Sequence, residues 1–90
     1  MPRVVYTPHL RRFFPELEEE SVPATTAREL VAELDLRHPG IASYLVEDDG
    51  SLRKHVNLFI DEDPLRDRVA LSDALSGDCV VHVIQALSGG

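Results

Sequence analysis

The sequence contains no tryptophan, a single cysteine and no hydrophobic run long enough to cross a membrane. Because a disulfide needs two thiols, Cys79 cannot form one within the chain, and such sparing use of cysteine is typical of a reducing compartment. The first residues also lack the apolar stretch and the small-residue cleavage site of a signal peptide. These absences predict a cytoplasmic protein that is not inserted in a membrane.

Positive charge is scarce in this chain. Nine lysines and arginines are set against sixteen aspartates and glutamates, which leaves a formal net charge of −7. Proteins that bind nucleic acids carry clustered basic residues, whereas the basic residues here are scattered apart from Arg11-Arg12 and Arg53-Lys54. The composition therefore argues against a nucleic-acid partner, and the acidic surface favours a basic protein partner.

Motifs for catalysis and for cofactor binding are also missing. There is no glycine-rich phosphate loop and no dinucleotide fingerprint, because the only adjacent glycines are at the end of the chain. The acidic clusters at residues 18–20 and 61–63 are more typical of solvated loops than of cation ligands. We therefore expect no catalytic residue of the protein's own, no metal and no bound cofactor.

The histidines and the cysteine have simpler explanations than catalysis. The four histidines do not follow metal-ligand spacing, although His55 and His82 would become neighbours if their strands paired. Cys79 opens an apolar run, and we interpret it as a small buried side chain. A reactive thiol would need a lowered pKa, and the negative charge of the adjacent Asp78 acts in the opposite direction.

The length and the hydrophobic content fit one small folded domain. The 90 residues are 43% hydrophobic, and we assign residues 1–84 to the domain and residues 85–90 to a flexible C-terminal tail. β-Branched, aromatic or alternating residues predict strands at residues 3–7, 17–22, 55–60 and 79–84. The second strand carries three glutamates and is expected at an edge of the sheet, whereas the last is almost wholly apolar and is expected at its centre.

One main helix is predicted at residues 26–37. Thr26 and Glu29 have the spacing of a capping box, apolar residues follow on one face, and Pro39-Gly40 ends the helix. The remaining segments are a connection whose aromatic residues partly pack on the core (9–15), a stretch left open between helix and strand (41–46), a turn (61–64) and a further helical turn (71–75). This order predicts an α+β domain, a mixed sheet of four to five strands with one main helix on one face.

Two of the predicted strands place an apolar patch on the open face of the sheet. In residues 55–60 the aliphatic side chains alternate toward the core, so that Phe59 points away from it. In residues 79–84 the same alternation turns Val80, His82 and Ile84 outward. Such a patch is typical of a protein contact, unless the connection at residues 9–15 covers it, and the sequence leaves both interpretations open.

The chain ends in Gln-Ala-Leu-Ser-Gly-Gly, directly after the most apolar run. Given average glycine usage, two terminal glycines occur by chance in roughly one chain in two hundred. A glycine pair has no side chains and presents a bare carboxylate, so Gly89 and Gly90 suit a narrow channel in another protein. The alternative is a chain end without function.

The segment from Gly77 to Gly90 resembles the closing motif of the MoaD/ThiS family of small ubiquitin-like sulfur carriers. That motif is a Gly-Asp turn, a strand, an alanine-containing tail and a terminal Gly-Gly. Residues 55–63, His-Val-Asn-Leu-Phe-Ile-Asp-Glu-Asp, resemble the central strand of the family, and residues 26–40 resemble its capped helix. The resemblance covers nearly the whole chain and implies the β-grasp, or ubiquitin-like, fold.

The chain departs from the family pattern in two places. Gln85 stands where the family often has proline, and residues 61–63 stand where it often has a turn of the Asn-Gly type. The extra length at residues 41–54 resembles the branch that includes the carrier for cysteine synthesis.

The resemblance implies a function for the tail. A separate E1-like enzyme would use ATP to adenylate the Gly90 carboxylate, and sulfur would replace the AMP to give a thiocarboxylate that donates sulfur in cofactor or cysteine biosynthesis. Gly89 would provide steric clearance, the tether would be Ala86, Leu87 and Ser88, and the partner-binding patch would be Phe59, Val80, His82 and Ile84.

Other functions remain open at this stage. The partner that takes the sulfur would be an accepting enzyme or, if the chain is the small subunit of molybdopterin synthase, the large subunit of that enzyme. A ubiquitin-like modifier that is conjugated to lysines through Gly90, a binding module and a purely structural β-grasp domain are the alternatives.

Overall fold

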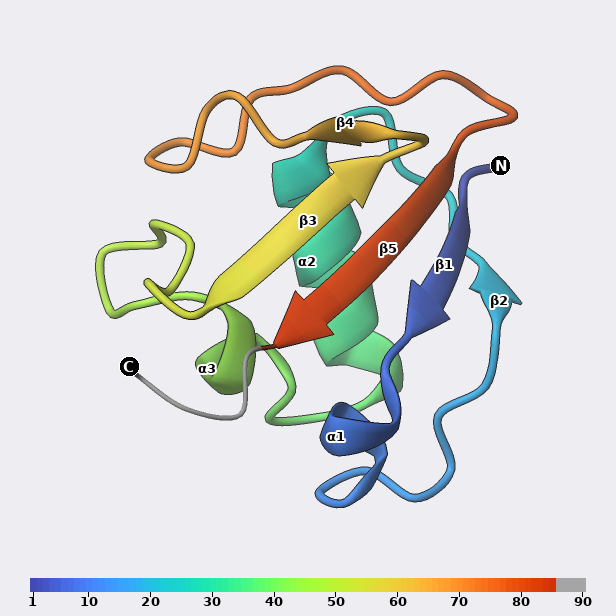
Figure 1. The fold of residues 1–90 in the computed structure, drawn as a ribbon, viewed down its shortest axis with the longest axis vertical. Helices are drawn as coiled ribbons and strands as arrows, with labels where there is room; N and C mark the ends of the chain where they lie inside the picture. The colour runs from blue at the N-terminus through green and yellow to red at the C-terminus, as the bar shows by residue number, and fades with distance from the viewer. Residues whose placement is uncertain (86–90) are drawn as a thin grey trace.

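The structure is a computed structural model that describes residues 1–85, and these residues form one mixed sheet with the main helix α2 behind it (Figure 1). The strand order is β2-β1-β5-β3-β4. Along the chain the elements are β1 (Arg3–Tyr6), α1 (Pro8–Arg11), β2 (Glu20–Ser21), α2 (Ala27–Arg37), α3 (Ala42–Leu45), β3 (Val56–Ile60), β4 (Asp63–Pro64) and β5 (Val80–Gln85). The predicted mixed sheet with one main helix on one face is confirmed.

The helix α2 begins and ends where the sequence predicts. The Thr26 hydroxyl oxygen accepts a hydrogen bond from the amide of Glu29 at 3.2 Å, which satisfies one of the free donors at the helix N-terminus. The Glu29 carboxylate accepts hydrogen bonds from the amide and the hydroxyl of Thr25, at 2.8 and 2.6 Å, one residue earlier than in a standard capping box. Beyond the last turn, Gly40 has a φ of +98°, which a residue without a Cβ adopts at little cost.

The core lies between α2 and the sheet. Leu30 and Leu34 of α2 are fully buried, and each contributes about 1.5–3 kcal/mol relative to an exposed leucine. The sheet side of this core consists of alternate strand residues: Val4, Tyr6, Val56, Leu58, Val81 and Val83. β5 is the central strand, as predicted, because it pairs in parallel with β1 and antiparallel with β3.

Residues 71–75 do not form the predicted helical turn. Leu71 has a φ of +53°, which is outside the helical region, and Ala74 forms an antiparallel bridge with Thr26. The Asp73 carboxylate accepts hydrogen bonds from the backbone amides of Arg66 and Asp67, at 2.9 and 2.8 Å. Such side-chain acceptors compete with helical hydrogen bonds, so the apolar spacing of this segment misled the sequence prediction.

Two segments that lacked a firm assignment contain short helices. α1 lies within the predicted connection and begins at Pro8, whose fixed φ suits the first helical position. Its Leu10 is fully buried, and Phe14 after it packs partly on the core, as predicted. The open segment at residues 41–46 contains α3, with Leu45 buried in the core.

The strand boundaries also differ from the prediction. The predicted turn at residues 61–64 is tighter, because Asp61 has a φ of +57° and β4 begins at Asp63, opposite Ile60. β2 contains only two residues of the predicted strand at 17–22, and it lies at an edge as expected. β5 extends through Gln85, which pairs with Val56. No helix among residues 1–85 is long and apolar enough to cross a membrane.

A polar network centred on Glu20 ties the edge strand β2 to the end of α2. The Glu20 carboxylate accepts a hydrogen bond from the Tyr6 hydroxyl at 2.7 Å, contacts His38 Nε2 at 2.7 Å and accepts a hydrogen bond from Arg37 at 3.1 Å. Burial raises the pKa of Glu20, but the hydrogen bonds from these three residues outweigh burial and leave the pKa below its ordinary value. Burial, and then the bond to Glu20, raises the pKa of Tyr6, which therefore remains a donor.

This network predicts a pH-dependent contribution to stability. Since the pKa of Glu20 is lowered in the folded state, its contribution is complete above the ordinary value of 4.5 and is lost as the pH falls through the folded value. Glu20→Gln should lower the free energy of unfolding by about 1–3 kcal/mol near neutral pH. The difference between variant and wild type should shrink at about pH 3.

Urea unfolding of both proteins at the two pH values measures this difference. Glu18→Gln, at an exposed position in the same segment, is the matched control and should change the free energy little at either pH. A Glu20→Gln penalty that is equal at both pH values would show that the carboxylate charge is not involved.

Candidate functional site

The candidate site begins where β5 leads into the C-terminal residues. At this end of the sheet Val56 is opposite Gln85, and Val83 is paired with Tyr6 of the parallel neighbour β1. β5 is therefore held on both sides close to its last residue. The predicted tail residues after it lie outside the described part of the chain: Ala86, Leu87, Ser88, Gly89 and Gly90.

The register of the sheet brings the predicted patch residues together. Phe59 of β3 is directly opposite His82 of β5, and residues that are opposite each other in a sheet share a face. Val80 and Ile84 lie two residues on either side of His82 and share that face as well. All four have partly exposed side chains, with Ile84 the most open at 36% exposure. The predicted juxtaposition is therefore present, whereas its role in partner binding stays a prediction.

Val5 is a further member of this face that the sequence analysis missed. It pairs with His82 across β1 and β5 and is half-buried, while its neighbours Val4 and Tyr6 are buried in the core. The alternation within residues 3–6 was a usable signal, but only the parallel pairing of β1 with β5 shows what Val5 lies beside. We call Val5, Phe59, Val80, His82 and Ile84 the outer face.

The connection at residues 9–15 packs elsewhere. Phe13 and Phe14 both contact Tyr44 of α3, with ring centroids 5.0 and 5.2 Å from that of Tyr44; the first pair is tilted and the second is edge-to-face. α1 and α3 lie near the lower end of β5 in Figure 1, and no described element crosses in front of β3 and β5 there. Of the two interpretations that the sequence left open, the structure favours an uncovered outer face for residues 1–85.

Polar groups at both ends of β3 hold the outer face in position. The Asp61 carboxylate accepts a hydrogen bond from the amide of Val80 at 3.0 Å, so the turn after β3 is fixed to the start of β5. At the other end of β3, the Arg68 guanidinium donates to Asn57 Oδ1 at 3.1 Å and to the carbonyl of Val56 at 2.9 Å. The apolar centre with a polar rim matches the anatomy of a protein interface.

The remaining candidates for chemistry are dispersed or buried. His82 is opposite Phe59, four residues from His55, so these two histidines are not the neighbours that strand pairing could have made them. Among residues 1–85 no three metal-ligating side chains form a cluster suited to a metal ion. Burial raises the pKa of the Cys79 thiol, which is 2% exposed, and the cysteine is the small buried side chain that the sequence predicts.

The chain is similar to proteins of known structure and to one protein family. The family model described as the ThiS family matches residues 4–90. A chain of the Amycolatopsis orientalis BexX/CysO complex has a TM-score of 0.85 at 20% identity, with 100% of both chains covered. Mycobacterium tuberculosis CysO has a TM-score of 0.83 at 20% identity, covering 97% of this chain and 100% of that one. SAMP1 from Haloferax volcanii has a TM-score of 0.74 at 18% identity, covering 99% and 98%.

No curated protein sequence matches the chain. The structural matches confirm the predicted β-grasp fold, since each of the three covers at least 97% of the chain. The family match covers nearly the whole chain and includes the two terminal glycines. The chain therefore belongs to the ThiS family of ubiquitin-like sulfur carrier proteins.

Proposed function

We propose that the chain is a sulfur carrier whose C-terminal Gly90 carboxylate is adenylated by a separate E1-like enzyme and converted to a thiocarboxylate. The observation that supports this most is the position of the two terminal glycines. They follow the central strand β5 after a short segment, and they lie within the residues that the family model matches. The rest of the chain contributes the fold and a docking surface. The partner enzyme binds ATP and provides the catalytic groups.

The chemistry explains why a glycine carboxylate is needed. A carboxylate is a poor electrophile until one of its oxygens becomes a good leaving group. Attack of a Gly90 oxygen on the α-phosphorus of ATP releases pyrophosphate and leaves an acyl-adenylate. Sulfide then attacks the carbonyl carbon and displaces AMP, whereas a persulfide gives an acyl disulfide that a second thiol must cleave. Glycine hinders these in-line approaches least, because it has no side chain.

The outer face is the proposed docking surface for the enzymes that use the tail. It lies on β5 and the two strands beside it, so a partner seated there would be close to the base of the tail. Its apolar side chains would be desolvated on binding, which supplies most of the affinity of a protein interface. The net charge of −7 would steer the carrier toward a basic surface around the partner's channel.

The similarity to CysO favours sulfur donation in cysteine synthesis as the pathway. Donation to a pterin, as the small subunit of molybdopterin synthase, is the closest variant, because it uses the same thiocarboxylate. The similarity to SAMP1, a small archaeal modifier protein, favours a second candidate function, conjugation to lysines through Gly90.

Intact-mass analysis tests the carrier function directly. The full chain is incubated with a cognate activating enzyme, ATP and a sulfide donor, and the expected product is heavier by the difference between sulfur and oxygen. Omitting ATP is the control and should leave the mass unchanged. Isopeptide-linked products on lysines, without a thiocarboxylate, would favour the modifier, and the absence of any adenylate or thiocarboxylate would contradict both.

A further inference from the structure

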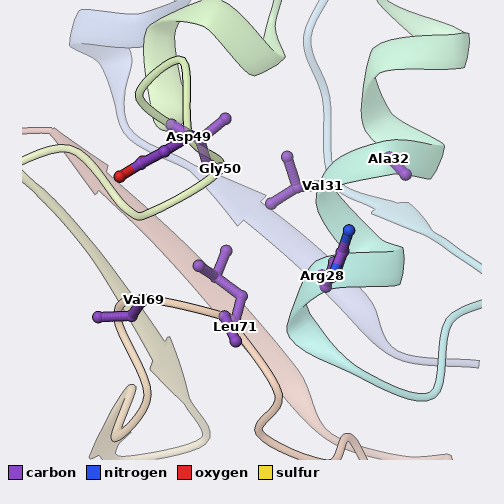
Figure 2. A pocket seen from close by; sticks show the side chains of 9 residues that line it. Arg28, Val31, Ala32, Asp49, Gly50, Val69 and Leu71 are labelled. Carbon is purple, nitrogen blue, oxygen red and sulfur yellow. The ribbon is translucent and has the colours of Figure 1, made fainter.

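A cavity of about 430 Å³ lies between α2 and two loops, and none of its lining residues belongs to the outer face (Figure 2). It is built from α2, from the loop that follows α3 and from the loop that follows β4. The lining is mostly apolar and consists of Val31, Ala32, Val46, Val69, Ala70 and Leu71, with Gly50 and two charged residues at the margin. This volume and lining are typical of small-molecule sites, which measure roughly 300–1,000 Å³.

The side of the cavity formed by the loop after β4 is held in place by side-chain hydrogen bonds. The Asp67 carboxylate accepts hydrogen bonds from the amides of Val69 and Ala70, at 3.0 and 2.9 Å, and from the Ser72 hydroxyl. These hydrogen bonds, of which that from Ser72 has the largest effect, lower the pKa of Asp67 to about 2, so the carboxylate stays charged well below neutral pH. Leu71, which anchors this loop in the core, has a φ of +53°, in the left-handed region that non-glycine residues rarely adopt.

The wall from the loop after α3 is a compact turn. The amide of Glu47 donates to the carbonyl of Ser51 at 2.8 Å, and the Asp49 carboxylate accepts from the amide and the hydroxyl of Ser51 at 2.9 and 2.7 Å. The loop after β4 is also joined to α2, because the amide of Arg28 donates a hydrogen bond to the carbonyl of Leu71 at 2.8 Å. The cavity therefore has fixed sides, although its segments are far apart in the sequence.

The two charged residues at the cavity differ in how their charges are satisfied. Hydrogen bonds from the hydroxyl and the amide of Ser51 lower the pKa of Asp49, so its carboxylate is charged and already accepts two hydrogen bonds. In Figure 2 the Asp49 side chain is turned away from Arg28. Arg28 is on the opposite side, and within residues 1–85 its guanidinium forms no ion pair and no side-chain hydrogen bond. An arginine at the margin of an apolar cavity is suited to an incoming carboxylate.

We propose that this cavity binds a small amphiphilic carboxylate, with the apolar part against Val31 and Val69 and the carboxylate paired with Arg28. The apolar lining would contact the body of such a ligand, and the exposed guanidinium of Arg28, which has no ion-pair partner among residues 1–85, would pair with its charged end. Val69 is 75% exposed in the structure, and burial of this side chain by the ligand would add to the affinity. The site is separate from the outer face, so the proposal does not depend on the sulfur-carrier function.

Titration of the ¹⁵N-labelled full chain with hexanoate, followed by amide chemical shifts, tests the proposal. Saturable shifts are expected at the amides that line the cavity, and hexanoate should bind at least about tenfold more tightly than hexanol, which lacks the charge. Hexylamine should bind no better than hexanol. Equal binding of the three probes, preference for the amine, or shifts confined to the outer face would each overturn the proposal, as would the absence of saturable shifts.

Charge reversal at Arg28 separates recognition from general electrostatics. Arg28→Glu should lower the affinity for hexanoate at least about tenfold, and it places an acid in the first turn of α2, where the helix dipole tolerates it. Arg66→Glu changes the net charge equally at an exposed position outside the cavity, and it should leave the affinity within about twofold. Equal losses in both variants would contradict a specific site at Arg28, and amide spectra of both variants report whether the fold is kept.

Discussion

Deletion of Gly90 is expected to abolish formation of the thiocarboxylate while leaving the fold intact. The deletion withdraws the terminal carboxylate by one residue, about 3.3–3.6 Å of extended chain. Because a displacement of about 1 Å can reduce an enzymatic rate about a hundredfold, we expect a loss of at least that size. The rate of pyrophosphate release in the presence of the activating enzyme, ATP and the variant measures it.

A chain extended by one additional glycine is the matched control for this deletion. It keeps the glycine terminus but moves the carboxylate outward by the same distance, so it should also be a poor substrate. The thermal midpoints of both variants should equal that of the wild type, because a terminal residue contributes little to the core. Efficient charging of either variant would contradict the proposal that the Gly90 carboxylate is positioned by the length of the tail. Loss of folding in the deletion would contradict the idea of a free tether.

Replacement of Phe59 by serine should weaken docking rather than chemistry. Phe59 lies directly opposite His82, the central residue of the outer face, and truncation of an aromatic anchor in a protein interface can cost about 2 kcal/mol or more. The apparent KM of the activating enzyme for the carrier should therefore rise at least about thirtyfold, with kcat nearly unchanged. Steady-state pyrophosphate release over a range of carrier concentrations separates the two constants.

Leu36→Ser is the control for this substitution. Leu36 is 77% exposed on α2, on the other side of the sheet, so its truncation removes an apolar side chain without touching the outer face. The apparent KM of the activating enzyme for this variant should stay within about twofold of its value for the wild-type carrier. If Leu36→Ser raised KM and Phe59→Ser did not, the partner would dock on the helix side of the domain.

Local sequence signals accounted for the main elements of the fold. The Thr26 cap, the apolar face of α2 and the alternation in β3 depend on residues that are close along the chain, so their spacing was sufficient to predict them. The same signals placed β5 at the centre, because an almost wholly apolar strand is typical of an interior position in a sheet. The resemblance of the closing segment to one family then indicated the tail as the reactive part.

Local signals failed where side chains compete with the backbone for hydrogen bonds. The apolar spacing of Leu71 and Leu75 suggested a helical turn. Both leucines instead belong to an irregular loop, from which their side chains reach into the core, and hydrogen bonds to Asp67 and Asp73 hold that loop in place. An aspartate carboxylate can accept hydrogen bonds from several backbone amides at once, and its position in the loop decides which amides donate to it. That choice depends on the folded loop and is not visible in the order of residues.

The sequence by itself determined the main helix α2, the strands β1, β3 and β5, and the acidic composition, since each depends on composition or on short-range spacing. The tertiary structure alone decided which distant residues meet. Pairing of β5 with β1 and β3 brings Val5 and Phe59 to His82, and the meeting of α2 with two loops forms the cavity beside Arg28. Contacts between remote segments depend on strand register and loop closure, to which all parts of the chain contribute at once.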